Sequence, residues 1–162
     1  MSLSTGICDV TTLLSGTPVS AIFSMDTEGA PIKLTQVSLV CTRRGECKQI
    51  YNTYSDSGVL SDGKKQNFID TLNQAKVIVG YNLDSDLKAL ALQGITIPDN
   101  IVLIDLYHTS IYLKDHEHLT VEGLTGCALS DVATYYGVKE VKSFHNSLVD
   151  AKVTMDLFWR MV

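Results

Sequence analysis

The stretch VSAIFSMDTEG, residues 19–29, determines how the rest of the chain is interpreted. Its first part, Val19–Met25, is a short apolar run, which predicts a buried strand. Asp26 and Glu28 follow where this run ends, and side chains at positions i and i+2 of an extended chain share a face. We therefore expect both carboxylates on one side of a sheet, where they repel each other without a cation. The alternative is that D-T-E-G is only a polar turn that closes a hairpin.

Strand and helix patterns follow this stretch. The segments Leu34–Thr42 and Glu46–Tyr51 flank Arg43–Gly45 like the arms of a hairpin, which makes the first strands a meander of three. Helical spacing then predicts a helix in Lys65–Ala75, and Val77–Val79 reads as a buried strand. The later predicted segments are a helix at Leu83–Leu92, a strand at Ile101–Ile104, a helix from Leu106, a helix at Ala128–Tyr136 and a last helix through Met155–Met161. This order predicts an α/β fold, a mixed sheet with helices on both faces.

Length and composition predict one globular domain. With 162 residues the chain can bury a single core, and we assign 19–162 to that domain and 1–18, rich in Ser, Thr and Gly, to a poorly ordered arm. Hydrophobic residues make up 45%, and no apolar run approaches the ~20 residues that cross a bilayer. The first ten residues also lack the pattern of a secretion signal. We therefore expect an intracellular protein, cytoplasmic or nuclear, with no membrane partner.

The cysteines and the net charge limit which kinds of protein the chain can be. The cysteines Cys8, Cys41, Cys47 and Cys127 form no C-x-x-C pair, and we expect reduced thiols, although Cys41 and Cys47 could face each other across the hairpin. The net charge of −5 argues against broad electrostatic wrapping of nucleic acid. It is compatible with a small acidic pocket that binds Mg²⁺, because such an ion reverses the local sign of charge.

A second acidic motif lies in Val79–Leu90, VGYNLDSDLKAL, where a buried strand runs into a helix that carries Asp86. The carboxyl ends of strands are where α/β sheets place their ligands. The structural alternative is that Asn82 or Asp84 caps the helix and that Asp86 is a first-turn acid favoured by the helix dipole.

The third motif, HNSLVD at residues 145–150, opens the last helix. Ser147 followed by Asp150 is typical of an N-cap with an acidic third residue, which gives Asp150 a structural alternative. A lone histidine such as His145 is likewise more often structural than catalytic. Taken together, the three motifs favour a functional interpretation, because their order and their places on strands and helices fit one site.

Together these motifs resemble those of the DEDDh 3′-to-5′ exonucleases of the RNase H-like superfamily, in particular the branch of interferon-induced and ribosomal-RNA-processing RNA exonucleases. The resemblance spans Ala21 to Phe158. The family's D-x-E, G-H-x-x-x-x-D-x-x-x-L and H-x-x-x-x-D-A motifs are matched by Asp26 and Glu28, by Gly80, Asp86 and Leu90, and by His145, Asp150 and Ala151. A sister family has a Tyr four residues before the last Asp, where this chain has Asn146, which cannot act as a base. Tyr81, where many relatives have His, departs from the pattern.

The resemblance implies an RNase H-like fold and hydrolysis of RNA or DNA from single-stranded 3′ ends, with release of nucleoside monophosphates. It implies two divalent cations, Mg²⁺ or Mn²⁺, which prefer oxygen ligands. Asp26 would bridge both ions, and Glu28 and Asp150 would hold mainly the ion that activates water. Asp86 would support the site through ordered waters, and His145 would be the general base.

The same resemblance implies where the substrate binds. The terminal nucleotide would contact Thr27, Gly29 and Ala30 on one side, with Asn82 and Leu83 on the other wall. Partners are single-stranded 3′ ends and, if the chain is part of a longer polypeptide, its other domains. The sequence leaves open whether RNA or DNA is cut, because that choice depends on contacts to the 2′-hydroxyl. It also leaves the oligomeric state open.

Three alternatives compete with this interpretation. The domain could be a catalytically silent module that binds nucleic acid or protein, although all five motif residues are present. An RNase H-type endonuclease shares the acidic clusters but has no reason to keep the His-x4-Asp-Ala ending. The segment 115–118, DHEH, offers a zinc site, which the lack of neighbouring cysteines disfavours.

Overall fold

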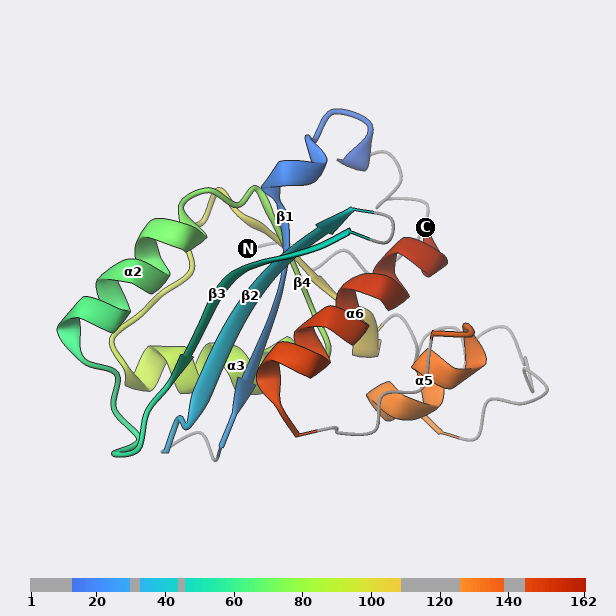
Figure 1. The fold of residues 1–162 in the computed structure, drawn as a ribbon. Helices are drawn as coiled ribbons and strands as arrows, with labels where there is room; N and C mark the ends of the chain where they lie inside the picture. The colour runs from blue at the N-terminus through green and yellow to red at the C-terminus, as the bar shows by residue number, and fades with distance from the viewer. Residues whose placement is uncertain (1–12, 30–32, 44–45, 109–125, 139–144) are drawn as a thin grey trace.

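The computed structural model describes residues 13–29, 33–43, 46–108, 126–138 and 145–162. Helices and strands alternate along the chain much as the sequence predicts (Figure 1). In chain order they are η1 (Val19–Ala21), β1 (Ile22–Glu28), β2 (Gln36–Arg43), β3 (Glu46–Tyr54), α2 (Asp62–Leu72), β4 (Val77–Gly80), α3 (Leu83–Leu92), β5 (Val102–Asp105), α5 (Leu129–Tyr135) and α6 (Ser147–Met161). The predicted helix after Leu106 is seen only in its first residues, up to His108, and its remainder lies outside the described part.

The strands form one five-stranded mixed sheet in the order β3-β2-β1-β4-β5. β1 pairs antiparallel with β2 and parallel with β4, so the central strand joins the meander to the parallel half. β2 pairs antiparallel with β3, and β4 pairs parallel with β5. The predicted α/β class and the predicted meander are therefore confirmed.

The strand β1 begins later than predicted and extends further. Val19–Ala21 form a 3-10 turn, and the strand runs through Asp26 and Glu28 to pair with Ser38 and Gln36 of β2. The alternative that D-T-E-G is only a turn is thus wrong, because both carboxylates belong to a paired central strand. The turn itself follows at Gly29, whose φ is +102°.

Alternate side chains of the sheet enter two separate cores. Phe23 and Met25 of β1 pack in a cluster that contains Phe68 of α2 and Leu90 of α3. On the opposite face, a second cluster joins Ile22 to residues of α5 and α6, among them Phe158. Figure 1 shows the same division, with α2 and α3 on one side of the strands and α6 crossing the other.

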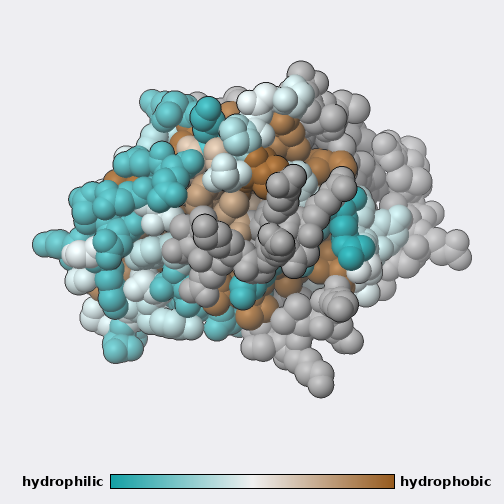
Figure 2. Space-filling model, turned by 45° about the horizontal axis from the view of Figure 1, so that its top comes forward, coloured by the Kyte–Doolittle hydropathy of each residue, from teal (hydrophilic) through white to brown (hydrophobic). Residues whose placement is uncertain are grey.

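The helix α2 illustrates how an amphipathic segment covers the sheet. It starts at Asp62, earlier than predicted, because the Ser61 hydroxyl accepts a hydrogen bond from the Lys64 backbone N–H at 3.4 Å. Phe68 and Leu72 are buried beneath it. Hydrophilic residues gather on the side of the molecule where α2 lies (Figure 2). Burial of one apolar stripe is what holds such a short helix in place.

The predicted arm is in part packed against the domain. Leu13 and Leu14 contact the second core cluster, while residues 1–12 lie outside the described part. In the part of the chain that the structure describes, Cys41 and Cys127 are not in disulfide bonds. Cys41 lies opposite Lys48 and Cys47 lies opposite Thr42, so the two cysteines do not face each other across the hairpin. Within the described residues, every helix is too short or too polar to cross a membrane.

Candidate functional site

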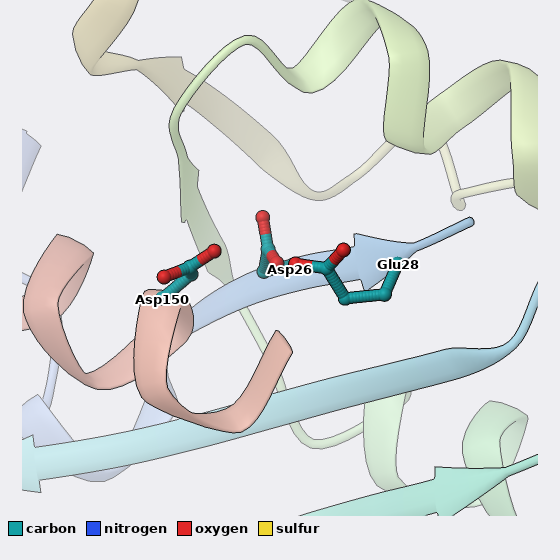
Figure 3. A group of neighbouring side chains, drawn as sticks. All are labelled: Asp26, Glu28 and Asp150. Atoms are coloured by element: carbon teal, nitrogen blue, oxygen red, sulfur yellow. The ribbon is translucent and has the colours of Figure 1, made fainter. Parts of the chain in front are cut away.

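Three carboxylates from two distant parts of the chain meet on the α6 face of the sheet. Asp26 and Glu28 lie two residues apart on β1, and Asp150 lies in the first turns of α6. One oxygen from each carboxylate lies within 4.8 Å of the other two. Figure 3 shows the Asp150 side chain directed from its helix toward Asp26 and Glu28 on the strand. The structure therefore brings these predicted residues together, including the one remote in sequence.

The helix α6 reaches this place because its first turn is tied to the sheet. The Ser24 hydroxyl of β1 donates a hydrogen bond of 2.6 Å to the backbone carbonyl of Ala151, the residue after Asp150. The helix itself starts at Asn146, whose side-chain oxygen accepts from the backbone N–H groups of Leu148 and Val149. The interpretation of Ser147 as the N-cap is thus wrong by one residue.

Asp26 is the most perturbed group of the site. Burial, followed by the negative charges of Asp86, Asp150 and Glu28, raises its pKa from 3.8 to about 10. Although the residue as a whole is partly exposed, its Oδ2 atom is buried. Together with Asp150 Oδ1, this is one of two buried side-chain oxygens in the described segments that lack a hydrogen-bond partner. An unsatisfied buried carboxylate oxygen is costly and calls for a proton or a cation.

Glu28 and Asp150 are also held away from their charged forms. Burial is the first cause of the raised pKa of both groups, and the charge of Asp150 adds to it for Glu28. A hydrogen bond between the two carboxyls raises the pKa of Glu28 and lowers that of Asp150. Burial is therefore the first cause of the raised pKa of all three acids of the site.

Asp86 lies behind the other three acids rather than among them. It is 3% exposed in α3, and its Oδ1 accepts from the backbone N–H of Thr27 at 2.9 Å and from the Thr27 hydroxyl at 2.5 Å. Burial raises its pKa to about 7, and both Thr27 hydrogen bonds act against that rise. Asp86 thus orients the strand between Asp26 and Glu28. Its predicted role of supporting the site fits this position.

His145 lies just before the cap of α6 and interacts electrostatically with Glu28 and Asp150. Its side chain is exposed, and its φ of +72° is unusual for a residue with a side chain. Its charge lowers the pKa of Glu28, and its backbone N–H together with its charge lowers that of Asp150. The positive φ is a backbone strain that the residues around it must hold.

The predicted substrate contacts have varied surroundings. Thr27 is engaged by Asp86, and Gly29 is required by its turn, because a Cβ there would lie 2.1 Å from the carbonyl oxygen of Lys33. Asn82 is exposed, with a φ of +61°. Leu83 is 1% exposed and lies in the first core, and its place in the wall of the substrate site stays a prediction. Ala30 lies outside the described residues, as do residues 115–118 of the zinc alternative.

Sequence reasoning missed the part that Asp105 plays. This residue ends β5 and is 2% exposed. Its carboxylate accepts hydrogen bonds from the backbone N–H groups of Asn82, Leu83 and Tyr107 at 2.8–3.0 Å. It thereby caps α3, a place that the sequence gives to Asn82 or Asp84. An aspartate at the end of a buried strand was the available signal, since such a carboxylate needs donors nearby.

The donor set fits a hard divalent ion. Three carboxylates converge, two of their oxygens are buried without hydrogen-bond partners, and burial disfavours their charged forms. Oxygen ligands of this kind suit Mg²⁺ or Mn²⁺ rather than a soft metal. No protein family model matches the chain, and no curated protein matches it. What this site can bind is therefore inferred from the positions and surroundings of its acids alone.

Proposed function

We propose that the protein is a metal-dependent 3′-to-5′ exonuclease of the DEDDh type with an RNase H-like fold. The observation that carries the proposal is the meeting of Asp26, Glu28 and Asp150 within 4.8 Å, beside an exposed His145. The strand order, an antiparallel meander continued by two parallel strands, is consistent with an RNase H-like arrangement. A sheet edge at the carboxyl end of a central strand is a common place for ligands.

Asp26, Glu28 and Asp150 are the residues that would hold Mg²⁺ or Mn²⁺, with Asp86 supporting Asp26 from behind. When bound, divalent ions supply positive charge that neutralises the acids and stabilises the negative charge of phosphodiester hydrolysis. The three carboxylates would determine where the ions, and so their positive charge, are held. Because the pKa of each of these three acids is raised, binding of an ion would be accompanied by release of protons.

His145 is the proposed general base. Imidazole accepts and releases a proton near neutral pH, which suits removal of a proton from an attacking water. The residue stands just before Asn146, the cap of α6, and its exposed ring can pass the proton on to solvent. The net charge of −5 favours an end-on encounter with a single strand over wrapping of a duplex.

The test uses matched single-stranded RNA and DNA, labelled at the 5′ end, with Mg²⁺ or Mn²⁺. We expect a ladder of products shortened one nucleotide at a time from the 3′ end, and nucleoside monophosphates in solution. Asp26→Ala and His145→Ala should be almost silent while they remain folded. The RNA and DNA arms identify the preferred sugar.

Asp84→Ala is the matched control for this test. Asp84 lies on α3 close to Asp86 in sequence, but its side chain is 68% exposed and pairs with Lys88 at the surface. Its loss should leave cleavage unchanged. Internal cuts would instead indicate an endonuclease, and no cleavage of any strand would indicate a silent binding module. Equal cleavage by wild type and His145→Ala would remove the assigned base.

A further inference from the structure

We propose that Gln36 and Ser38 of β2 are positioning residues, which fix α6 so that Asp150 and His145 meet the acids of β1. This inference rests on the proposed function. In the sheet, Gln36 lies directly opposite Glu28, and Ser38 lies directly opposite Asp26. Directly opposite residues of antiparallel strands share a face. A polar pair on β2 thus lies beside the acidic pair on β1, under the first turn of α6.

Gln36 holds the start of α6 with both ends of its amide. Its Oε1 accepts from the backbone N–H of Ser147 at 3.0 Å, and its Nε2 donates to the cap oxygen of Asn146 at 3.3 Å. Nε2 also donates to Asn52 Oδ1 of β3 at 2.9 Å. The Gln36 side chain is 3% exposed. One buried amide therefore links the cap and the first residue of the helix to the antiparallel half of the sheet.

Ser38 adds a second link one pair further along the strands. Its hydroxyl lies 2.6 Å from the hydroxyl of Ser147 and donates to Asn52 Oδ1 at 2.8 Å. Ser38 and Ser147 are both fully buried. The network thus joins β2, β3 and α6 through side chains that lie more than a hundred residues apart in the chain, as the separation of 109 between the two serines shows.

The polar nature of this contact points to positioning. Hydrogen bonds have preferred distances and angles, whereas an apolar contact tolerates sliding. A buried polar network contributes little net stability compared with an apolar one of the same volume. A functional site needs its groups held to within about 0.5 Å, and one residue of a helix already corresponds to about 1.5 Å along its axis. Gln36 and Ser38 fix the position of the start of α6 on the sheet, and with it the positions of His145 and Asp150.

The experiment compares Gln36→Met with Gln93→Met. Methionine has about the length of glutamine without its hydrogen bonds. Gln93 is a matched control, because it is 7% exposed and also links two segments, accepting from Leu60 N and donating to Gly58 O at 3.0 Å each. It lies with α3 on the other side of the sheet. We measure Mn²⁺ affinity without nucleic acid, then kcat and KM on the preferred single strand.

We expect Gln36→Met to weaken Mn²⁺ binding about ten-fold, the effect of losing a group that orients metal ligands, and to lower kcat with little change in KM. Gln93→Met should lose a similar amount of stability yet keep its Mn²⁺ affinity and kcat. If the two variants have equal Mn²⁺ affinities and equal kcat, the positioning role is overturned. If Gln36→Met does not fold, Ser38→Ala decides the question by the same measurements, with Ser55→Ala as its control. Ser55 is buried and donates to Val59 O at 2.8 Å.

The measurements distinguish a wrong positioning role for Gln36 and Ser38 from a wrong proposed function. A wild-type protein that binds Mn²⁺ but cuts no strand contradicts the nuclease, and the Mn²⁺ affinities of the variants still decide the positioning role. A wild-type protein that cuts, with Gln36→Met cutting equally well and binding Mn²⁺ equally well, contradicts the positioning role alone. A wild-type protein that binds no Mn²⁺ overturns both.

Discussion

The two faces of β1 differ in kind. Phe23 and Met25 point into the core beneath α2 and α3 and are fully buried among apolar side chains. Ser24, Asp26 and Glu28 alternate with them on the side of α6, where Ile22 at the start of the strand joins the second apolar core. One face of β1 is therefore apolar at Phe23 and Met25, whereas the other face becomes polar and acidic from Ser24 to Glu28.

The difference between these faces has an energetic consequence. Burial of apolar surface stabilises the fold in proportion to area, at about 25 cal/mol per Å². Asp26 on the other face works the other way, because burial, followed by the charges of Asp86, Asp150 and Glu28, raises its pKa to about 10. The two apolar cores thus supply the stability that offsets the cost of holding these acids together.

The largest expected effect comes from removing charge on the acidic face. Asp26→Asn should lower cleavage by about 10³-fold or more, because bound ions contribute several kcal/mol and each 1.4 kcal/mol is a factor of ten. The metal-free variant should nevertheless melt above wild type, by about 2–4 °C for each kcal/mol of repulsion relieved. Single-turnover cleavage and calorimetry test the two parts. A variant that loses activity and stability together would show that Asp26 is structural.

The apolar face should respond in the opposite way. Phe68→Ala removes a fully buried ring of α2 from the first core and should cost about 3–5 kcal/mol of folding free energy. Under conditions where the variant is folded, its cleavage per folded molecule should match wild type. Urea denaturation and active-site titration with Mn²⁺ check this. An equal loss of Mn²⁺ affinity in Phe68→Ala would mean that the two faces are not independent.

The free energy of unfolding should depend on pH because the pKa values of Asp26 and Asp86 are raised in the folded protein. Where a carboxyl has a raised pKa in the folded state, that state binds more protons than the unfolded chain, so stability falls as pH rises from the ordinary value toward the folded one. For Asp86 this window runs from 3.8 to about 7, and for Asp26 from 3.8 to about 10. Without ions, the melting temperature should therefore be several degrees lower at pH 8 than at pH 5, at about 2–4 °C for each kcal/mol.

Two controls sharpen this pH experiment. Mn²⁺ should raise the melting temperature most at pH 8, because the ion binds deprotonated acids and stabilises only the folded state. Asp26→Asn should flatten the slope between pH 5 and pH 8, since it removes the group with the widest window. If the melting temperature of Asp26→Asn depends on pH as strongly as that of wild type, the raised pKa of Asp26 does not cause the pH dependence.

Features that depend on neighbouring residues were predictable from the sequence. Period-two alternation is a local signal, so the apolar run and the shared face of Asp26 and Glu28 were predictable from adjacent residues. The spacing of the third motif placed Asp150 in the first turns of the last helix, and the structure places it there. The exact cap was not predictable, because Asn146 and Ser147 are both good cap residues and tertiary contacts choose between them.

The missed features are non-local. The contact of Gln36 with Ser147 spans 111 residues, and no pattern in either segment points to the other. The bonds of Asp105 to the start of α3 depend on the parallel pairing of β4 and β5, which brings two strand ends together. The burial of Leu83 follows from close packing on Gly80, where an added Cβ would lie 2.1 Å from the Leu83 side chain. Such fits are decided by three-dimensional packing rather than by composition.

The smallest expected effect tests Thr27 of β1, which hydrogen-bonds to Asp86 of α3. Thr27 lies between Asp26 and Glu28, and its hydroxyl donates to Asp86. Thr27→Val keeps the shape and the backbone hydrogen bond but removes this donor, so the pKa of Asp86 should rise further, because the hydroxyl favours the charged form. Stability should fall by about 1 kcal/mol at alkaline pH, where Asp86 is charged in both proteins, and stay unchanged at pH 4.

Thr27→Ser is the control for that change, since it retains the hydroxyl. Carbon-13 NMR titration of the Asp86 carboxyl measures its pKa directly in all three proteins, and urea denaturation at two pH values measures the stability. The expected order is wild type and Thr27→Ser together, with Thr27→Val above them in pKa. If Thr27→Val leaves the pKa of Asp86 unchanged, the hydroxyl contact does not favour the charged form of the acid, and only the backbone N–H bond of Thr27 is left to act in this way.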